Sequence, residues 1–390
     1  MEIHEVKLGD VAAVKGGKRL PKGINLVTKP NTHPYIRVRD LSGKRTLELD
    51  SSFEFVDDET QKTISRYIVN DGDIVLSIVG TVGLVAIVGK SLNEANLTEN
   101  CVKLTSLSGV DRDFLYYFLK SPYGQQEITR GTVGAVQAKL PIKNIQDITI
   151  PLPDKLTQSK IAAVLSSLDT KIETNQKIND NLQQQAAALF ANFYDHAETE
   201  VGFTEIIQIL GGGTPKTGES SYWNGNVPFF TPKDVGLPYT LSTEKTITEE
   251  GLAHCNSRLY PVNTVFVTAR GTVGKVGLPG VPMAMNQSCY ALVGKETHQL
   301  LVYFYTLKAV DRLKHKASGA VFDAITTRDF ESEIIMKLSD EDAQGFLDVA
   351  EPIYQAVLSN SIENLRLAAL RDSLLPKLMS GEIDVSDIQL

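Results

Sequence analysis

A chain of 390 residues is too long for one ordinary domain, so two or three domains are expected. Its 42% hydrophobic and 22% charged residues are typical of a globular protein, and Cys101, Cys255 and Cys289 lack the spacing of a disulfide framework or zinc knuckle. The net charge of −8 argues against a strongly basic surface for nucleic acid. However, the excess acid lies mainly in residues 155–200 and 338–390, and the two larger segments are close to neutral.

Neither a signal peptide nor a membrane span is predicted. The first residues show no basic segment followed by an apolar one, and serine, threonine and glycine interrupt the longest apolar stretch, at 74–88. We therefore expect a cytoplasmic protein with no membrane partner.

Strand and helix patterns alternate along the chain and then recur. Residues 73–79 form a branched apolar run that predicts a strand, and Gly-Thr-Val-Gly at 80–83 predicts a tight turn. Residues 113–120 then predict a helix rich in aromatic side chains. In the second half, residues 264–268 predict a strand and residues 299–308 a helix. Each half therefore predicts an α+β domain with a substantial sheet.

Short sequence matches relate the two halves in order. Gly16-Gly17 matches Gly211-Gly212, residues 34–41 match 228–235, and the sequence at 80–83 recurs unchanged at 271–274. The aromatic run 116–118 returns at 303–305, and 134–136 returns at 319–321. The separation falls steadily from 195 residues (16 and 211) to 185 residues (134 and 319). This regular order indicates a duplication with short loop insertions rather than a solenoid.

Each half ends in a segment with a heptad pattern. In the first, apolar residues alternate at spacings of four and three from Ile161 to Phe193, and an offset of 185 carries this pattern onto Phe346 to Leu378. Both seams have two asparagines at their centre, and buried asparagine fixes register at a cost in stability. Surface helices packed on their own domains are the alternative. The central seam positions are Leu168, Ile172, Asn175, Asn179 and Leu182, and Ile353, Val357, Asn360, Asn364 and Leu367.

The fold expected from these patterns is α+β, with two pseudo-repeated domains separated by two long antiparallel coiled-coil helices. We place the first domain at 1–154 and its helix at 155–196. The second domain occupies 197–339, and the second helix with a C-terminal tail occupies 340–390.

Several motifs resemble those of one family. Gly211-Gly212-Gly213-Thr214-Pro215-Lys216, then the sequences at 222–225 and 227–235, resemble the start of a target recognition domain of type I restriction-modification specificity subunits. The sequence at 374–383 resembles the C-terminus of that family. The resemblance covers essentially the whole chain, including the duplication. The first half departs from the pattern, because it has Lys-Arg-Leu-Pro after its Gly-Gly pair and no tryptophan.

The resemblance implies a function and a set of partners. Each target recognition domain would read one half of a bipartite double-stranded DNA target, with the paired helices as a ruler. Two methyltransferase subunits that use S-adenosylmethionine would bind the chain, and restriction subunits that use ATP and Mg²⁺ would bind through them. The chain itself would have no cofactor and no chemistry of its own.

The sequence lacks the common catalytic motifs of phosphate, metal and acyl chemistry. It has no P-loop, no metal-ligand spacing among its six histidines, no GxSxG sequence and no Asn-Pro-Pro-aromatic sequence. The glycine-rich stretch 271–277 lacks the loop length and the Ser or Thr of a P-loop. It predicts a turn between strands, with a loop presented to DNA as the alternative.

Basic side chains in or beside loops are the candidates for DNA contacts, because lysine and arginine bind phosphates and arginine also reads guanine. An ordinary solvated charge is the alternative for each. The aromatic runs 114–118 and 303–305 could stack on bases, but their helical spacing favours core packing. The basic candidates are Lys15, Lys18, Arg19, Lys22, Arg37, Arg39, Lys44 and Arg45 in the first half, and Lys216, Lys233 and Arg270 in the second.

Two other classes of protein compete with the specificity subunit. A coiled-coil adaptor whose twin domains bind protein rather than DNA would suit the weak charge. A nuclease would need clustered carboxylates with a lysine at metal-site spacing, and no such cluster is found in the sequence.

Overall fold

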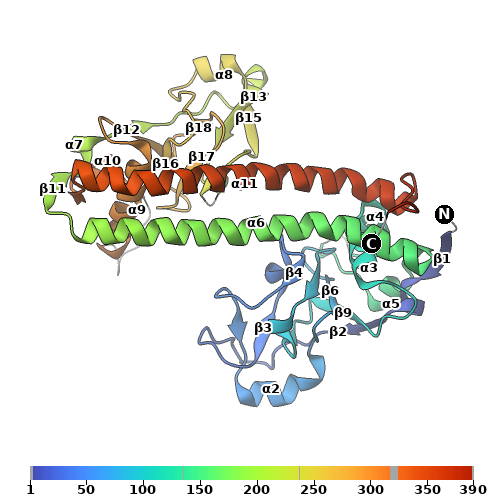
Figure 1. Ribbon diagram of the computed structural model, residues 1–390. Helices are drawn as coiled ribbons and strands as arrows, with labels where there is room; N and C mark the ends of the chain where they lie inside the picture. Colours follow the sequence, from blue (N-terminus) through green and yellow to red (C-terminus); the bar gives the residue numbers. More distant parts are fainter. Residues whose placement is uncertain (1–2, 135, 237, 317–323, 389–390) are drawn as a thin grey trace. The chain divides into compact units, whose positions relative to one another are not determined.

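The computed structural model of the chain describes residues 3–134, 136–236, 238–316 and 324–388 (Figure 1). It divides into two compact units, unit 1 (residues 1–172 with 366–390) and unit 2 (residues 173–365). Most of the predicted match between 134–136 and 319–321 lies outside the described residues. No described helix is long and apolar enough to cross a membrane.

The described residues of unit 1 form three sheets. The largest has the strand order β2-β9-β6-β7-β4, a second has the order β5-β3-β8, and β1 pairs with β10. All four residues of β6 are buried, as its branched apolar sequence predicts. The strands are β1 (Ile3–Lys7), β2 (Ala13–Gly16), β3 (Pro34–Ile36), β4 (Thr46–Leu47), β5 (Glu54–Phe55), β6 (Ile74–Ser77), β7 (Val85–Val88), β8 (Asn96–Leu97), β9 (Cys101–Thr105) and β10 (Thr149–Pro153).

Unit 2 repeats this topology strand for strand. Its sheets have the orders β12-β19-β16-β17-β14, β15-β13-β18 and β11-β20. The two parallel pairings of unit 1, β3 with β8 and β4 with β7, recur as β13 with β18 and β14 with β17. The predicted duplication and α+β class are therefore confirmed. The strands are β11 (Thr199–Gly202), β12 (Ile207–Gly211), β13 (Trp223–Phe230), β14 (Tyr239–Thr240), β15 (Lys245–Ile247), β16 (Val265–Thr268), β17 (Val276–Pro279), β18 (Ala284–Met285), β19 (Cys289–Gly294) and β20 (Ile334–Lys337).

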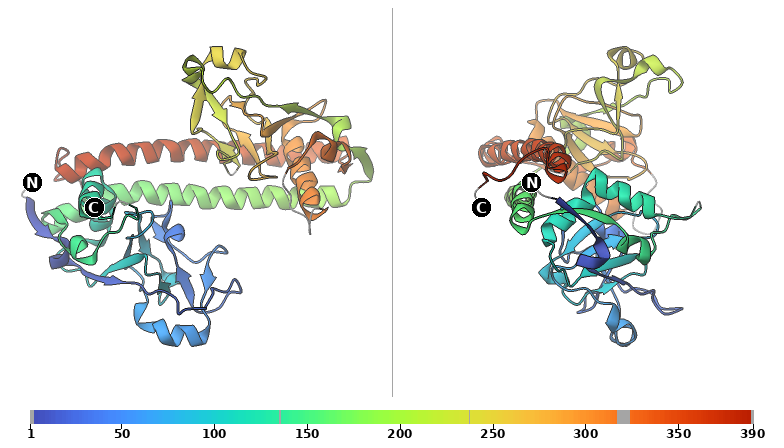
Figure 2. Two further views of the ribbon diagram at one scale, coloured as in Figure 1. Left: turned by 180° about the vertical axis from the view of Figure 1, so that it is seen from behind. Right: turned by 90° about the vertical axis from the view of Figure 1, so that its right-hand side faces the viewer.

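The α-helices also recur, with one difference. Unit 1 has two consecutive helices, α3 and α4, where unit 2 has the single helix α9, because Ser121 and Pro122 end α3 and begin α4. The two longest helices are continuous (Figure 2). The helices are α1 (Leu8–Val11), α2 (Asp58–Ile64), α3 (Arg112–Lys120), α4 (Pro122–Gly131), α5 (Ile142–Gln146), α6 (Lys155–Asp195), α7 (Phe203–Ile206), α8 (Glu249–Ala253), α9 (Gln299–Lys316), α10 (Thr327–Glu331) and α11 (Asp340–Ser380), with 3₁₀ turns η1 (Val38–Leu41), η2 (Ser65–Tyr67), η3 (Lys90–Leu92) and η4 (Ser220–Tyr222).

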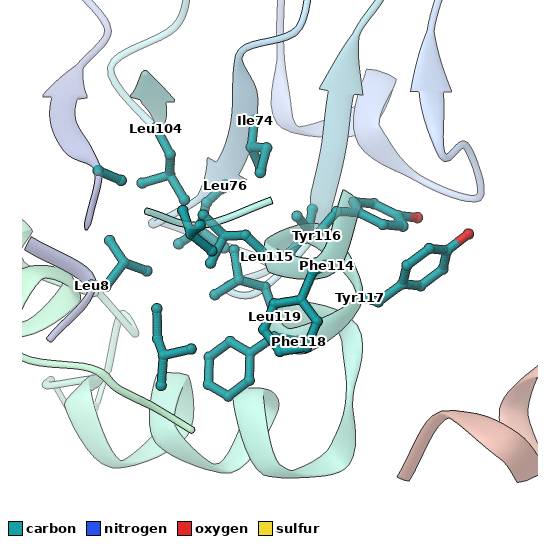
Figure 3. Close-up of a cluster of buried hydrophobic side chains, with 14 of the residues drawn as sticks. Leu8, Ile74, Leu76, Leu104, Phe114, Leu115, Tyr116, Tyr117, Phe118 and Leu119 are labelled. Atoms are coloured by element: carbon teal, nitrogen blue, oxygen red, sulfur yellow. The ribbon is translucent and has the colours of Figure 1, made fainter. Parts of the chain in front are cut away.

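The aromatic runs lie in the cores. Phe114, Tyr116, Tyr117 and Phe118 are at most 4% exposed, and α3 carries them against the large sheet of unit 1 (Figure 3). Residues 303–305 of α9 are buried in the same way in unit 2. Core packing, rather than base stacking, is therefore their role.

The repeated Gly-Thr-Val-Gly sequence forms the predicted turn. It joins β6 to β7 in unit 1 and β16 to β17 in unit 2, and each pair is antiparallel. Gly80, Gly83, Gly271 and Gly274 all have positive φ, between 72° and 93°, which glycine adopts without strain. The backbone geometry therefore explains why both glycines of the sequence are retained in the two halves.

Candidate nucleic-acid interface

The repeated Gly-Gly pair marks a close backbone approach. In unit 1 the amides of Gly17 and Lys18 donate to the carbonyls of Cys101 and Leu97, at 3.0 and 2.8 Å. A Cβ on Gly17 would lie 2.0 Å from the Thr98 carbonyl oxygen, so no other residue fits without movement. In unit 2 a Cβ on Gly212 would lie 2.1 Å from the Asn286 carbonyl oxygen. Both copies therefore fix the loop after β2 or β12 against the loop before β9 or β19.

This approach brings together a different pair of side chains in each unit. In unit 1, Arg19 Nε donates to Glu99 Oε1 at 2.7 Å. In unit 2, the Thr214 hydroxyl donates to Gln287 Oε1. Arg19 is 80% exposed, whereas Glu99 is 30% exposed. Partial burial raises the pKa of Glu99, but the hydrogen bonds from Arg19 and from its own backbone outweigh burial and lower the pKa below its usual value.

A second loop, at the end of β3, adds two more arginines in unit 1. The Arg37 amide donates to Asp40 Oδ2 at 2.7 Å, and the Thr231 amide donates to Asp234 Oδ2 at 2.8 Å in unit 2. The two turns are therefore built alike, on an aspartate retained in both halves. Burial raises the pKa of Asp40 to about 6, against the opposing effect of the nearby Arg39 guanidinium.

Arg37 is tied to the sheet yet not fully satisfied. Its guanidinium forms an ion pair with Glu54, which also lies 3.3 Å from Arg39 Nη2. The Nε and Nη2 atoms of Arg37 are buried and have no hydrogen-bond acceptor among the described residues. Arg19, Arg37 and Arg39 line one shallow depression of about 370 Å³, together with Tyr35, Thr98, Glu99 and Asn100. Three of the predicted basic residues thus converge on one surface of unit 1.

Arg45 lies apart from this depression. Its guanidinium forms a 2.5 Å ion pair with Asp113 and lies over the rings of Tyr116 and Tyr117, and its side chain is only 15% exposed. These contacts give Arg45 a packing role in unit 1.

The other predicted basic residues are exposed on strands and loops. Lys18 lies over the ring of Tyr67, and Lys44 forms an ion pair with Asp50 at 2.5 Å. In unit 2, the Lys216 carbonyl accepts a hydrogen bond from Trp223 Nε1 while its side chain stays exposed. The remaining exposed members of the predicted set are Lys15, Lys22, Lys233 and Arg270.

The asparagines of both predicted seams contact one another within unit 2. Asn175 Nδ2 donates to Asn364 Oδ1 at 2.9 Å and to Glu363 Oε2 at 2.7 Å, and Asn360 Nδ2 donates to Asn179 Oδ1 at 2.8 Å. Because the residue numbers rise in α6 as they fall in α11, the two helices run antiparallel here. Apolar seam residues flank the asparagines, with Val357 buried and Leu182 and Ile353 half-buried.

Within unit 1 the other ends of α6 and α11 also pack together. Ile161 and Leu165 of α6 share the hydrophobic core with Leu375 and Leu378 of α11. Of the predicted seam positions, Leu168, Ile172 and Leu367 are half-buried.

Sequence reasoning missed a buried ion pair at this helix contact. Arg371 Nη1 lies 2.5 Å from Asp169 Oδ1, and the Tyr117 hydroxyl donates to Asp169 Oδ2 at 2.6 Å. Burial lowers the pKa of Arg371, but hydrogen bonds to Asp169 and Asp372 outweigh it and raise the pKa above its usual value. The signal was an arginine at an apolar seam position, which requires a partner.

The described residues contain no group of three His, Cys, Asp or Glu side chains that could hold a metal ion. Burial raises the pKa of the Cys101 and Cys289 thiols to about 12, as expected for cysteines that pack in a core.

The family is shown by comparison with known proteins. The family model described as "Type I restriction modification DNA specificity domain" matches residues 2–184 and 199–342. The specificity subunit of the type I restriction enzyme MjaIX from Methanocaldococcus jannaschii is 22% identical over 409 residues, which cover 98% of this chain and 94% of that one. The EcoR124I/EcoR124II specificity subunit from Escherichia coli is 30% identical over 177 residues, or 40% of this chain and 42% of that one.

A solved structure agrees in fold. The S subunit of the type I restriction-modification system from M. genitalium has a TM-score of 0.58 and 15% identity, over 97% of this chain and 96% of that one. The chain belongs to the type I restriction-modification DNA specificity family. It is thus a non-catalytic subunit that recognises DNA targets, and the adaptor interpretation is set aside.

Proposed function

We propose that the chain reads a bipartite DNA target, with one half-site for each repeated domain. The observation that supports this is the pairing of an identical topology with different surface side chains: both units share their strand orders, yet Arg19, Arg37 and Glu99 correspond to Thr214, Thr231 and Gln287. A duplicated fold with changed side chains on corresponding loops suits two reading heads of different specificity.

The chain would bring partner subunits to that target. Its two domains are close to neutral, so additional positive charge for binding phosphates would have to come from another subunit. Two methyltransferase subunits with S-adenosylmethionine fit this need, with restriction subunits that use ATP and Mg²⁺ bound through them. α6 and α11, which contact each other in an antiparallel arrangement within unit 2, would set the length of the unread spacer.

The test is the methylated motif of a host that carries this chain with the methyltransferase subunit of its own system, read genome-wide. We expect two fixed half-sites separated by an unspecified spacer. Exchange of residues 1–154 for those of a relative should change one half-site and leave the other intact. A continuous motif, or a change in both half-sites with the fold preserved, would contradict the proposal.

The chain alone should bind DNA weakly. Its affinity should rise when the methyltransferase subunit is added, and the isolated chain should transfer no methyl group. Tight, sequence-specific binding by the chain alone would show that no second subunit is needed for affinity.

A further inference from the structure

Two loops meet at the same place in both domains and carry different side chains in each. The Gly17 and Gly212 contacts fix the backbones alike, because in each unit a Cβ would collide with the carbonyl oxygen of the facing loop. Arg19 and Glu99 therefore occupy the positions that Thr214 and Gln287 occupy in unit 2. The backbone contact is therefore the same in both units, whereas the side chains at these two positions differ.

In unit 1 the exposed side chain is Arg19, and Glu99 orients it. The bond from Nε to Glu99 fixes one edge of the guanidinium and leaves the Nη1 and Nη2 end free of any hydrogen bond to a described residue. That end is the planar fork that binds the O6 and N7 atoms of guanine. An arginine that is 80% exposed yet held at Nε is thus ordered in advance for this contact.

In unit 2 the roles of the two loops are reversed. Gln287 is exposed, and its Oε1 accepts a hydrogen bond from the half-buried Thr214. A second lone pair of Oε1 and both Nε2 protons remain for a ligand. This is the arrangement that pairs with N6 and N7 of adenine.

The neighbouring turn keeps its charged residues in both halves. Asp40 and Asp234 build equivalent turns, and Arg39 corresponds to Lys233, so a positive charge is kept beside the aspartate. A retained charge suits a phosphate contact, which is the same for every sequence. By contrast, Arg19 differs in chemistry from its counterpart Thr214, and Glu99 from its counterpart Gln287. Such differences are expected at positions that read bases.

We propose that these two pairs determine sequence specificity: Arg19, oriented by Glu99, reads a guanine in one half-site, and Gln287, oriented by Thr214, reads an adenine in the other. This inference rests on the proposed function, because it assigns one base contact to each reading head.

The test exchanges the pairs in the complex of the full chain with its methyltransferase subunit. One variant, Arg19→Thr with Glu99→Gln, places the unit 2 pair in unit 1, and the reciprocal variant is Thr214→Arg with Gln287→Glu. A matched control, Lys377→Thr with Glu382→Gln, removes the same two charges at an exposed ion pair on and after α11. Selection of bound DNA from a random library, together with the methylated motif, gives the specificity of each.

We expect the first variant to lose preference for guanine at one position of one half-site by about 10- to 100-fold and to favour adenine there. The reciprocal variant should change adenine to guanine in the other half-site, and the control should keep the parent motif. Arg19→Lys keeps the charge but not the fork, so it should retain affinity within about threefold while discrimination at that position falls.

Two results would contradict different claims. A folded exchange variant that keeps the parent motif at every position would overturn this inference and leave the two-headed reading intact. A variant of one unit that alters both half-sites would overturn the two-headed reading itself.

Discussion

The buried ion pair of unit 1, between Asp169 and Arg371, can be compared with the equivalent site in unit 2, which has no ion pair. Tyr117, Asp169 and Arg371 correspond through the repeat to Phe304, Tyr354 and Ala186 in unit 2. There the corresponding site is aromatic, with the Phe304 and Tyr354 ring centroids 5.7 Å apart and Ala186 fully buried. One fold thus accommodates either an ion pair or a small residue beside two edge-to-face rings at the same place.

Removal of one member of the ion pair should cost about 3 kcal/mol. Arg371→Ala leaves the Asp169 carboxylate buried, with its side chain 6% exposed and the Tyr117 hydroxyl as its remaining hydrogen-bond donor among the described residues. Loss of a buried partner costs about 3–5 kcal/mol, and we take the lower end because the Arg371 side chain is 28% exposed. The triple variant Tyr117→Phe, Asp169→Tyr and Arg371→Ala should recover to within about 1.5 kcal/mol of the parent.

Hydrogen exchange of the α3 and α6 amides, followed by mass spectrometry, measures the local free energy of opening. Arg366→Ala, at an exposed arginine of the same unit and helix, is the matched control and should change it by less than about 0.5 kcal/mol. If Arg371→Ala is no more destabilising than this control, the ion pair does not stabilise the helix contact. If the triple variant is as unstable as the single one, the two halves do not use interchangeable packing.

Three further outcomes are expected. Gly17→Ala and Gly212→Ala should lower the melting temperature by several degrees, because the new Cβ would collide with a carbonyl oxygen. Gly16→Ala and Gly211→Ala have room for a Cβ and should melt like the parent; equal melting temperatures for all four variants would show that the loops readily move apart. The raised pKa of Asp40, about 6, means that the folded state binds the proton more tightly than the unfolded state, so stability should fall as pH rises from about 4 to 6. Denaturant unfolding at the two pH values should show a smaller fall in Asp40→Asn, and an unchanged fall in this variant would refute the role of Asp40. One heptad added to both α6 and α11 lengthens each helix by about 10 Å, which corresponds to about 3 base pairs of DNA. The methylated motif should keep its half-sites with a spacer wider by about two or three base pairs, and an unchanged spacer in an active variant would show that the helices do not set the spacer length.

Much of the fold follows from the sequence because its signals are local or repeated. The heptad spacing predicts the two long helices, since side chains three and four residues apart share one helix face. The ordered matches between the halves predict the duplication, because a second copy of the same apolar pattern forms the same strands. The Gly-Gly pair was visible as a repeated motif, although its cause, a carbonyl about 2 Å from where a Cβ would lie, was not.

The pairing of side chains required the tertiary structure. The charge and loop position of Arg19 predict a DNA contact, but its partner Glu99 is 80 residues away. Thr214 and Gln287 carry no charge, so the same signal does not indicate them. Arg45 has the same charge and a similar local context, yet the fold commits it to Asp113, 68 residues away. Charge and periodicity determine which side chains can interact and which face of a helix or strand they occupy. The path of the loops, set by packing over the whole domain, decides which of them meet.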